Sequence, residues 1–370
     1  TTWGEKEGTV TNSERCITHI TPAVSRPGEA RPDWEIVVDF AHRLGARLGQ
    51  PLTGQLFPYA SPEAIFNEHR ESTRGRDLDI TGLSYALLDS SGPQQWPFPE
   101  GASSGRQRLY ADGVFPTPSG RARFVAVEHL PTAESTDETY PISLLSGRLR
   151  DQWHGMSRTG TVARLFNLDD EPLLSMHPAD LRQRGLAGGD VVRVGNARGQ
   201  VHVRVKPDAG LVRGRAWMPM HWGSQFMNSA GVNALTLSAY DPFSQQPELK
   251  HAAVAVEQAE LPWQLVVLRK AGSGELAALT LLAKARSLLP DFAFASVGLY
   301  GRSEALVVFR AAHGEALPES RLREIDALFG LDADAAAAIV YADPRRQISK
   351  RALAPDGKLI GIRLAGETQA

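Results

Sequence analysis

The sequence has a single cysteine, Cys16, among its 370 residues. One cysteine excludes a disulfide within the chain. It also excludes an iron–sulfur or zinc site built only from cysteines of this chain. The scarcity of cysteine is typical of reducing compartments, so we expect a cytoplasmic location.

Long apolar runs and an excess of one charge are also lacking. The most apolar stretch, residues 277–289, is interrupted by Lys284 and Arg286 and is shorter than the roughly 20 residues that cross a bilayer. The first residues contain no apolar core of a signal peptide. A net charge of −2 provides no strong field toward nucleic acid or an anionic membrane. We therefore expect neither as a partner. The chain does not begin with Met, which suggests a fragment or a processed product.

Common catalytic motifs are absent as well. The sequence has no G-x-G-x-x-G, no P-loop, no HExxH and no G-x-S-x-G. Its carboxylates show no spacing that pairs them for glycoside hydrolysis. We assign no catalytic residue and no metal ligand to this chain.

Three zones follow one another, and together they predict an α+β protein. Residues 1–140 are loop-rich, with helices expected at 33–49 and from Ser61, which would cap the N-terminus of a helix. Residues 82–120 are rich in Pro and Gly and are interpreted as a long functional or packed loop.

The second zone, residues 141–260, has short strands joined by tight turns. The expected strands are 142–145, 173–175, 190–194, 200–205 and 215–220. A short helix is expected at 177–185, and a hairpin turn at 196–199. This pattern predicts a closed β-barrel.

The third zone, residues 261–370, alternates strands with helices. Strands are expected at 264–268, 292–300, 305–310 and 358–363, and helices at 275–289, 319–329 and 334–341. The alternation predicts a small α+β domain.

Two clusters in the second zone combine residue types suited to a large, planar, phosphorylated ligand. The first, "SGRLRDQWHGMSRT" at residues 146–159, directly follows a strand. Its glycine permits close approach of backbone amides, and its Arg, Trp and His side chains offer planar forks and a stacking face. The second comprises "MPMHWG" at 218–223, "NALT" at 233–236 and "DPFSQQPELK" at 241–250. A charged surface loop is the alternative for the first cluster, and for His221 alone a structural role is the stronger interpretation.

Together with "MHPADLRQRGLAGGDVVRV" at 176–194 and "ARGQV" at 197–201, these clusters resemble the molybdopterin dinucleotide-binding domain of the dimethyl-sulfoxide-reductase superfamily. The resemblance implies a six-stranded double-psi barrel. It also implies that one pterin guanine dinucleotide is lined by Gly147, Arg148, Trp153, His154, Ser157, Arg158, His221, Trp222, Asn233 and Lys250.

The flanking zones extend this resemblance. "GEKEGTVTNSER" at 4–15 is similar to a segment near the metal centre of nitrate reductases and formate dehydrogenases, which implies that Thr11, Asn12, Glu14 and Arg15 lie near the substrate channel. Arg15 would attract nitrate, or alternatively form an ion pair with Glu14 or Glu29. "YALLDSSGPQQWP" at 85–97 and "DGVFPTPSGRARF" at 112–124 look most like assimilatory nitrate reductases. The third zone, with "YADPRR" at 341–346 and "DGKL" at 356–359, resembles a region that precedes an iron–sulfur module.

The resemblance implies the C-terminal part of a nitrate reductase that reduces nitrate to nitrite by oxygen-atom transfer. Its cofactor would be molybdenum bis(molybdopterin guanine dinucleotide), shared with an N-terminal part of the subunit, with an iron–sulfur cluster outside this chain. An electron-donor protein or reductase subunit would be the further partner. The alternatives are a formate dehydrogenase of the same superfamily, a non-catalytic scaffold subunit, and an isolated barrel that binds a partner protein.

Overall fold

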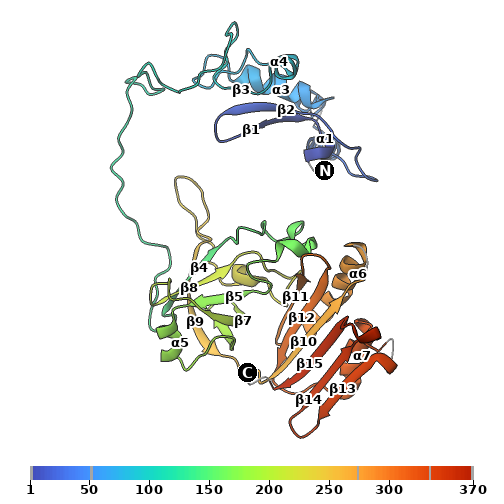
Figure 1. The fold of residues 1–370 in the computed structure, drawn as a ribbon. Coiled ribbons are helices and arrows are strands. Elements are labelled where there is room, and N and C mark those ends of the chain that lie inside the picture. Colours follow the sequence, from blue (N-terminus) through green and yellow to red (C-terminus); the bar gives the residue numbers. More distant parts are fainter. Residues whose placement is uncertain (1–2, 51–52, 273–274, 333–334, 368–370) are drawn as a thin grey trace. The chain divides into compact units, whose positions relative to one another are not determined.

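A computed structural model describes residues 3–50, 53–272, 275–332 and 335–367. The chain folds into two compact units, Thr1–Glu128 and His129–Ala370, whose elements are drawn in Figure 1. The division of the chain at residues 140 and 260 stays a prediction.

The first unit combines a small antiparallel sheet with short helices. Its strands, in the order β1-β2-β3, are β1 (Gly8–Thr11), β2 (Cys16–Ile20) and β3 (Gln94–Gln95). Its helices are α1 (Asp33–Arg47), α2 (Thr53–Leu56), α3 (Pro62–Ser72) and α4 (Tyr85–Ser91). The helix predicted at 33–49 is confirmed as α1, although Val37, Leu44 and Leu48 on its apolar face are 42–63% exposed. The Ser61 cap is confirmed too, since its hydroxyl accepts the Ala64 N–H at 3.2 Å.

The long loop predicted at 82–120 is wrong in part, because it contains α4 and β3. Ser84 caps α4 by accepting the Leu87 N–H at 3.1 Å. Tyr85 and Leu88 of this helix are buried in a cluster with Phe66 and other apolar residues. A helix of seven residues is too short to be stable alone, so tertiary burial decides its formation.

The second unit begins with a closed six-stranded barrel, as predicted. Around the barrel, the strands follow one another as β4 (Ile142–Gly147), β8 (Arg215–Pro219), β5 (Leu173–Met176), β7 (Gln200–Pro207), β6 (Val191–Gly195) and β9 (His251–Gln258). The pairs β4–β8 and β5–β7 are parallel, and the other neighbours are antiparallel. Apolar side chains that alternate along the strands, such as Leu144, Val192 and Val203, fill the interior.

The two local predictions within the barrel are confirmed. The 177–185 segment forms α5 (Pro178–Gln183) and ends at Gly185, whose φ of 67° suits a glycine. The hairpin turn at 196–199 joins β6 to β7, and the Asn196 N–H donates to the Gly199 carbonyl at 3.0 Å.

A six-stranded antiparallel sheet follows the barrel. Its order is β11 (Phe294–Tyr300), β12 (Leu306–His313), β10 (Trp263–Lys270), β15 (Gly361–Glu367), β14 (Ile348–Leu353) and β13 (Ala338–Asp343). The helices of this part are α6 (Glu275–Arg286) and α7 (Glu319–Leu328). They confirm the helices predicted around 275–289 and 319–329.

The helix predicted at 334–341 is wrong. Residue 334 lies outside the described residues, residues 335–337 form a single 3₁₀ turn, and β13 begins at Ala338. Alanines favour a helix, but pairing of β13 with all six residues of β14 overrides that propensity. Only the last part of the strand predicted at 358–363 is confirmed, since β15 begins at Gly361.

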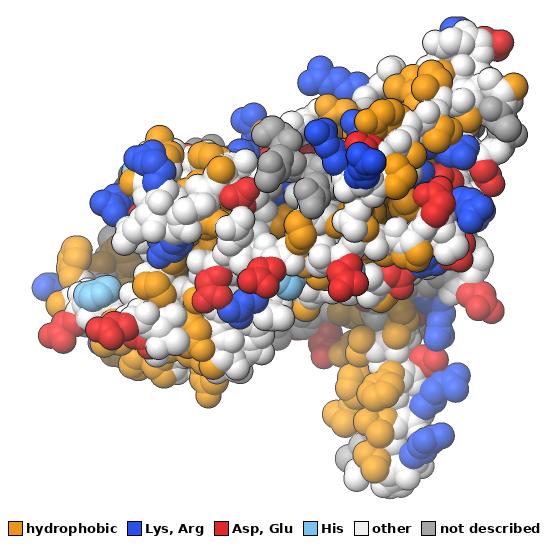
Figure 2. Space-filling view, turned by 90° about the horizontal axis from the view of Figure 1, so that it is seen from below, with side chains coloured by type: hydrophobic (Ala, Val, Ile, Leu, Met, Phe, Trp, Pro, Cys, Tyr) orange, Lys and Arg blue, Asp and Glu red, His pale blue; other side chains and the backbone are white. Residues whose placement is uncertain are grey.

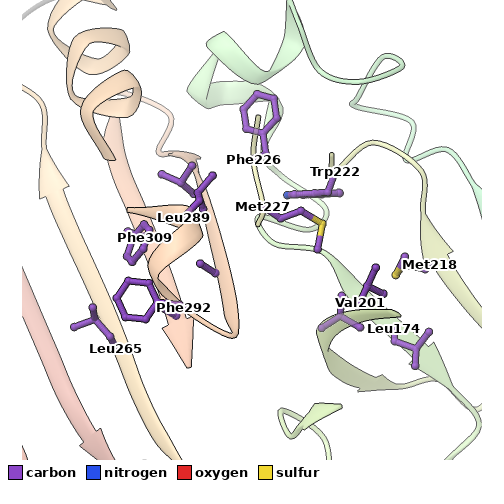
Figure 3. Close-up of a cluster of buried hydrophobic side chains, with 14 of the residues drawn as sticks. Leu174, Val201, Met218, Trp222, Phe226, Met227, Leu265, Leu289, Phe292 and Phe309 are labelled. Carbon is purple, nitrogen blue, oxygen red and sulfur yellow. The ribbon is translucent and has the colours of Figure 1, made fainter. Parts of the chain in front are cut away.

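Barrel and sheet share one hydrophobic core. Figure 3 shows Trp222, Phe226 and Met227 from the loop after β8 on one side, with Leu289 and Phe292 on the other. The Val297 N–H of β11 donates to the Phe226 carbonyl at 2.9 Å. The loop after β8 is thus held against the sheet.

The surface carries both signs of charge. On the face drawn in Figure 2, basic and acidic side chains are interspersed among apolar ones. In the described part of the chain, every helix is too short or too polar to cross a membrane.

Candidate functional site

The parallel pair β4–β8 brings the two clusters to one end of the barrel. Parallel neighbours finish at the same end of a sheet, so the segments after Gly147 and after Pro219 both start there. The backbone links them directly, because the Met220 N–H donates to the Gly147 carbonyl at 2.9 Å.

The turn at 196–199 lies at this same end. Strand β9 is antiparallel to both β4 and β6, so β4 and β6 point the same way. The amide of Asn196 donates to the carbonyl of Leu235 at 2.8 Å, which places the 3₁₀ helix Gly231–Ala234 beside this turn. Asn233 in that helix is exposed.

Gly147 occupies a position that has no room for a side chain. A Cβ built there would lie 2.8 Å from Nε1 of Trp217 on β8. The chain therefore leaves β4 with its backbone close to that indole, and an exposed backbone at a strand end can approach a ligand closely.

His221 joins the two clusters from beneath. Its side chain is 0% exposed. Its Nε2 accepts the Leu149 N–H at 2.8 Å, so Nδ1 carries the proton and donates to the His154 carbonyl at 2.7 Å. Burial lowers the pKa of His221 below its ordinary value of 6.5, and the bond to the His154 carbonyl opposes this shift only in part. Both ring nitrogens are used, so His221 positions the loop rather than offering a polar atom to a ligand.

Trp222 is also buried, at 2% exposed, and packs in the common core. Its indole Nε1 is a buried donor with no hydrogen-bond partner within the described structure. Buried donors of this kind normally have a hydrogen-bond partner. Gly231 packs over the Trp222 backbone, where a Cβ would lie 2.0 Å from the Trp222 carbonyl oxygen.

An exposed layer lies above these buried side chains. The indole of Trp153 is 56% exposed, and the guanidinium of Arg148 lies 5.0 Å from its ring centroid. The ring of His154 meets Trp153 edge-on at 4.5 Å. Ser157 and Arg158 follow in the same loop and are exposed. This layer offers an aromatic face and cations to a ligand.

Met156 anchors the loop that carries this layer. Its side chain is 0% exposed, while its backbone and that of His154 have positive φ values of 58° and 45°. This anchoring role was not predicted from the sequence, although the apolar residue between His154 and Arg158 is its signal.

Lys250 belongs to the second cluster but lies beside the first cluster. Its Nζ is 4.0 Å from Sδ of Met220. The Ser146 hydroxyl donates to the Leu249 carbonyl at 2.8 Å. Lys250 thus stands next to the end of β4, with its ammonium exposed.

The four residues predicted for a substrate channel form the turn between β1 and β2. The side-chain carbonyl of Asn12 accepts the N–H groups of Glu14 at 2.9 Å and Cys16 at 3.0 Å. Thr11 is the last residue of β1 and is exposed, as is Glu14.

Arg15 is held by backbone carbonyls. Its guanidinium donates to Trp96, to Arg106 at 3.1 Å and to Gln107 at 2.8 Å. It pairs with neither Glu14 nor Glu29 among the ion pairs of the described residues, so that alternative is wrong. Attraction of nitrate by Arg15 stays a prediction.

Groups of three or more His, Cys, Asp or Glu side chains that could hold a metal ion do not occur among the residues described here. The candidate site consists of backbone groups, aromatic rings, cations and the neutral side chains of Ser157 and Asn233.

Comparison with known proteins agrees with this arrangement. Residues 142–253, which cover the barrel up to β9, match the molydopterin dinucleotide binding domain, and residues 1–43 match the molybdopterin oxidoreductase family. In these two segments, the chain is similar to the molybdopterin oxidoreductases.

Several relatives of this chain are nitrate reductases. It is 39% identical to a nitrate reductase of Klebsiella oxytoca, over 69% of this chain and 29% of that protein. It is 32% identical to the assimilatory nitrate reductase catalytic subunit of Bacillus subtilis, over 68% of this chain and 34% of that protein. An F420-dependent formate dehydrogenase 2 subunit alpha of Methanococcus maripaludis is 34% identical, over 69% of this chain and 35% of that protein. The chain spans about a third of the length of these relatives.

Proposed function

We propose that this chain forms one wall of the binding site for a molybdopterin guanine dinucleotide in an assimilatory nitrate reductase. The observation that carries the proposal is the hydrogen bond between His221 and the His154 carbonyl. This bond joins the two clusters that are predicted to bind the ligand, at one end of a barrel whose residues match a dinucleotide-binding domain. The parallel pairs β4–β8 and β5–β7 support a double-psi connectivity for this barrel.

The residues present suit such a ligand. Backbone at Gly147 and the cations of Arg148, Arg158 and Lys250 would hold the diphosphate, because guanidinium and ammonium groups bind phosphate through charge-assisted hydrogen bonds. The exposed face of Trp153 suits a planar ring.

Ser157 and Asn233 would add neutral hydrogen bonds, and His154 would support the ring contact through its edge-on packing on Trp153. His221 and Trp222 would act from beneath as positioning residues.

When bound, molybdenum bis(molybdopterin guanine dinucleotide) supplies the oxygen-atom transfer that converts nitrate to nitrite. The chain contributes binding and orientation. An N-terminal part of the subunit would complete the cofactor site, and an iron–sulfur cluster outside this chain would receive electrons from a donor protein or reductase subunit. Thr11, Asn12, Glu14 and Arg15 would border the path of nitrate. The proposed location is the cytoplasm.

Cofactor content tests the first part of the proposal. In the holoenzyme, Arg148→Ala and Lys250→Ala should each lower molybdenum and pterin per folded protein. Arg182→Ala is the matched control: Arg182 is an exposed cation on α5. That helix follows β5, which is antiparallel to β8 and ends at the opposite end of the barrel. Unchanged cofactor content in both site variants, or an equal loss in the control, would refute the assignment.

Turnover by the holoenzyme tests the substrate. Formate dehydrogenases are also among the relatives, at 34% identity, so formate is the second candidate. Reduction of nitrate by a reduced viologen, without oxidation of formate, is the expected result. Formate oxidation alone would replace the nitrate proposal. Full cofactor content without either activity would favour a scaffold subunit.

A further inference from the structure

A cavity of about 970 Å³ lies at one end of the six-stranded sheet. Strands β10 and β11 finish there at Lys270 and Tyr300, and strands β12 and β15 start there. The segment at residues 161–164 and helix α6 complete the wall. Every lining residue belongs to the second unit, and none of the ten residues predicted for the dinucleotide is among them.

The cavity is rich in positive charge. The lining contains the cations Arg164, Arg269, Lys270, Arg302 and Lys358. Its one carboxylate belongs to Glu304. That carboxylate forms an ion pair with Lys270, whose Nζ lies 2.7 Å from Oε2 of Glu304. Accordingly, the hydrogen bond from Lys270 lowers the pKa of Glu304.

The other four cations lack such a partner. Within the described side chains, Arg164, Arg302 and Lys358 form no ion pair, and Arg269 donates only to the carbonyls of Phe329 and Ile360, both at 3.0 Å. Burial lowers the pKa of Arg269. Cations gathered in a concave wall attract an anion more strongly than scattered ones do.

The floor of the cavity is aliphatic. It includes Val162, Ala271, Leu299 and Ile360, and none of the lining residues is aromatic. A ligand that binds by ring stacking would find no partner here. Guanidinium forks instead match phosphate oxygens in a bidentate geometry. The volume is that of a small-molecule site.

We propose that this cavity binds a small phosphorylated molecule with two or more phosphate groups, held by Arg164, Arg269, Arg302 and Lys358. The phosphate groups contact these four cations, and any apolar part of the ligand lies on the aliphatic floor. Glu304 weakens binding, because it adds a negative charge and engages Lys270. This site does not depend on the proposed nitrate reductase function.

Titration calorimetry of the 370-residue chain with inorganic tripolyphosphate tests the proposal. The double variant Arg302→Gln, Lys358→Gln should lower affinity about tenfold or more, since each neutralised cation removes a charge-assisted contact. The matched control is Arg182→Gln, Arg345→Gln, which removes two exposed cations outside the cavity. It should bind like the parent chain.

Glu304→Gln provides a second test, in which the expected result is a gain in affinity that a misfolded variant would not show. Removing this carboxylate frees Lys270. It should raise the affinity for tripolyphosphate about threefold or more, because the wall loses a negative charge that repels the negatively charged ligand. Absence of saturable binding to the parent chain, equal losses in the two double variants, or weaker binding to Glu304→Gln would each overturn the proposal. Binding of a poly-glutamate peptide in place of tripolyphosphate would overturn it as well, and would assign the cavity to an acidic protein segment.

Discussion

Nδ1 of His221 donates a hydrogen bond to the backbone carbonyl of His154, 2.7 Å away and 67 positions earlier in the chain. Nε2 of the same ring accepts the Leu149 N–H at 2.8 Å. One buried imidazole therefore holds a surface loop at two points. It can do so only while it is neutral, because Nε2 must keep its lone pair.

This requirement predicts a pH dependence of stability. The pKa of His221 is lowered in the folded protein, so below about 6.5 the unfolded chain takes up a proton that the folded chain resists. Stability is thus fully present above the unfolded pKa and is lost as pH falls through the folded pKa. Urea midpoints at pH 7.5 and 5.5 should show this loss. His221→Gln, which cannot titrate, should show a smaller difference; an identical difference in both proteins would contradict the neutral histidine.

Gly147→Ala tests the tight contact at the end of β4. The new Cβ would lie 2.8 Å from Nε1 of Trp217 and must displace the indole or the strand. We expect a loss of about 1–3 kcal/mol in the free energy of unfolding, and lower cofactor content in the holoenzyme. Gly155→Ala, in the same loop, is the control because a Cβ there meets nothing within 4 Å. Equal stability of both variants would show that Gly147 is not constrained.

Asp326→Ala tests the buried ion pair of the third zone. Arg363 is 1% exposed, and its Nε donates to Oδ1 of Asp326 at 2.7 Å. Removing the carboxylate leaves a buried cation unpaired, which costs about 3–5 kcal/mol. Glu324→Ala on the same helix removes a carboxylate that is 61% exposed and pairs with Arg321, so it should cost less than about 1 kcal/mol. Chemical denaturation measures the free energy of unfolding of both variants. Similar losses would show that the buried pair of Arg363 and Asp326 contributes no more to stability than the exposed pair.

Asn228→Ala tests the link between the loop after β8 and the sheet. The side-chain amide donates to the carbonyls of Phe292 at 2.8 Å and Ala293 at 3.1 Å, and its oxygen accepts the Ala295 N–H at 3.2 Å. Three hydrogen bonds are lost and backbone groups are left unpaired, so we expect about 2–3 kcal/mol of destabilisation. Hydrogen exchange at Ala295 should also become faster. Asn233→Ala, an exposed asparagine of the same loop, should change neither value; unchanged exchange in Asn228→Ala would argue against the link.

Local signals in the sequence predicted many elements of the fold correctly. The turn at 196–199 and the helix stop at Gly185 depend on neighbouring residues only, and both occur where expected. Alternating apolar residues identified several strands of the barrel. By contrast, the alanine-rich segment after residue 334 has a helical composition, and only its pairing with β14 makes it a strand.

The candidate site shows the same division. Residue types alone pointed to the Trp153–His154 and His221–Trp222 corners. They did not distinguish an exposed contact from a buried support. Trp153 is exposed and Trp222 is buried, although both are tryptophans next to a histidine in a loop.

By itself, the sequence determined the barrel-forming pattern, the two clusters and their likeness to a dinucleotide-binding domain, because strand alternation and turn chemistry are properties of neighbouring residues. Tertiary structure decided that parallel strands β4 and β8 bring those clusters to one end of the barrel. It also decided that His221 supports the loop from below and that Arg164 of the second zone shares a cavity with Arg269, Arg302 and Lys358 of the third zone. Each of these depends on contacts between residues far apart in the chain, and no local pattern encodes which distant backbone group a side chain will meet.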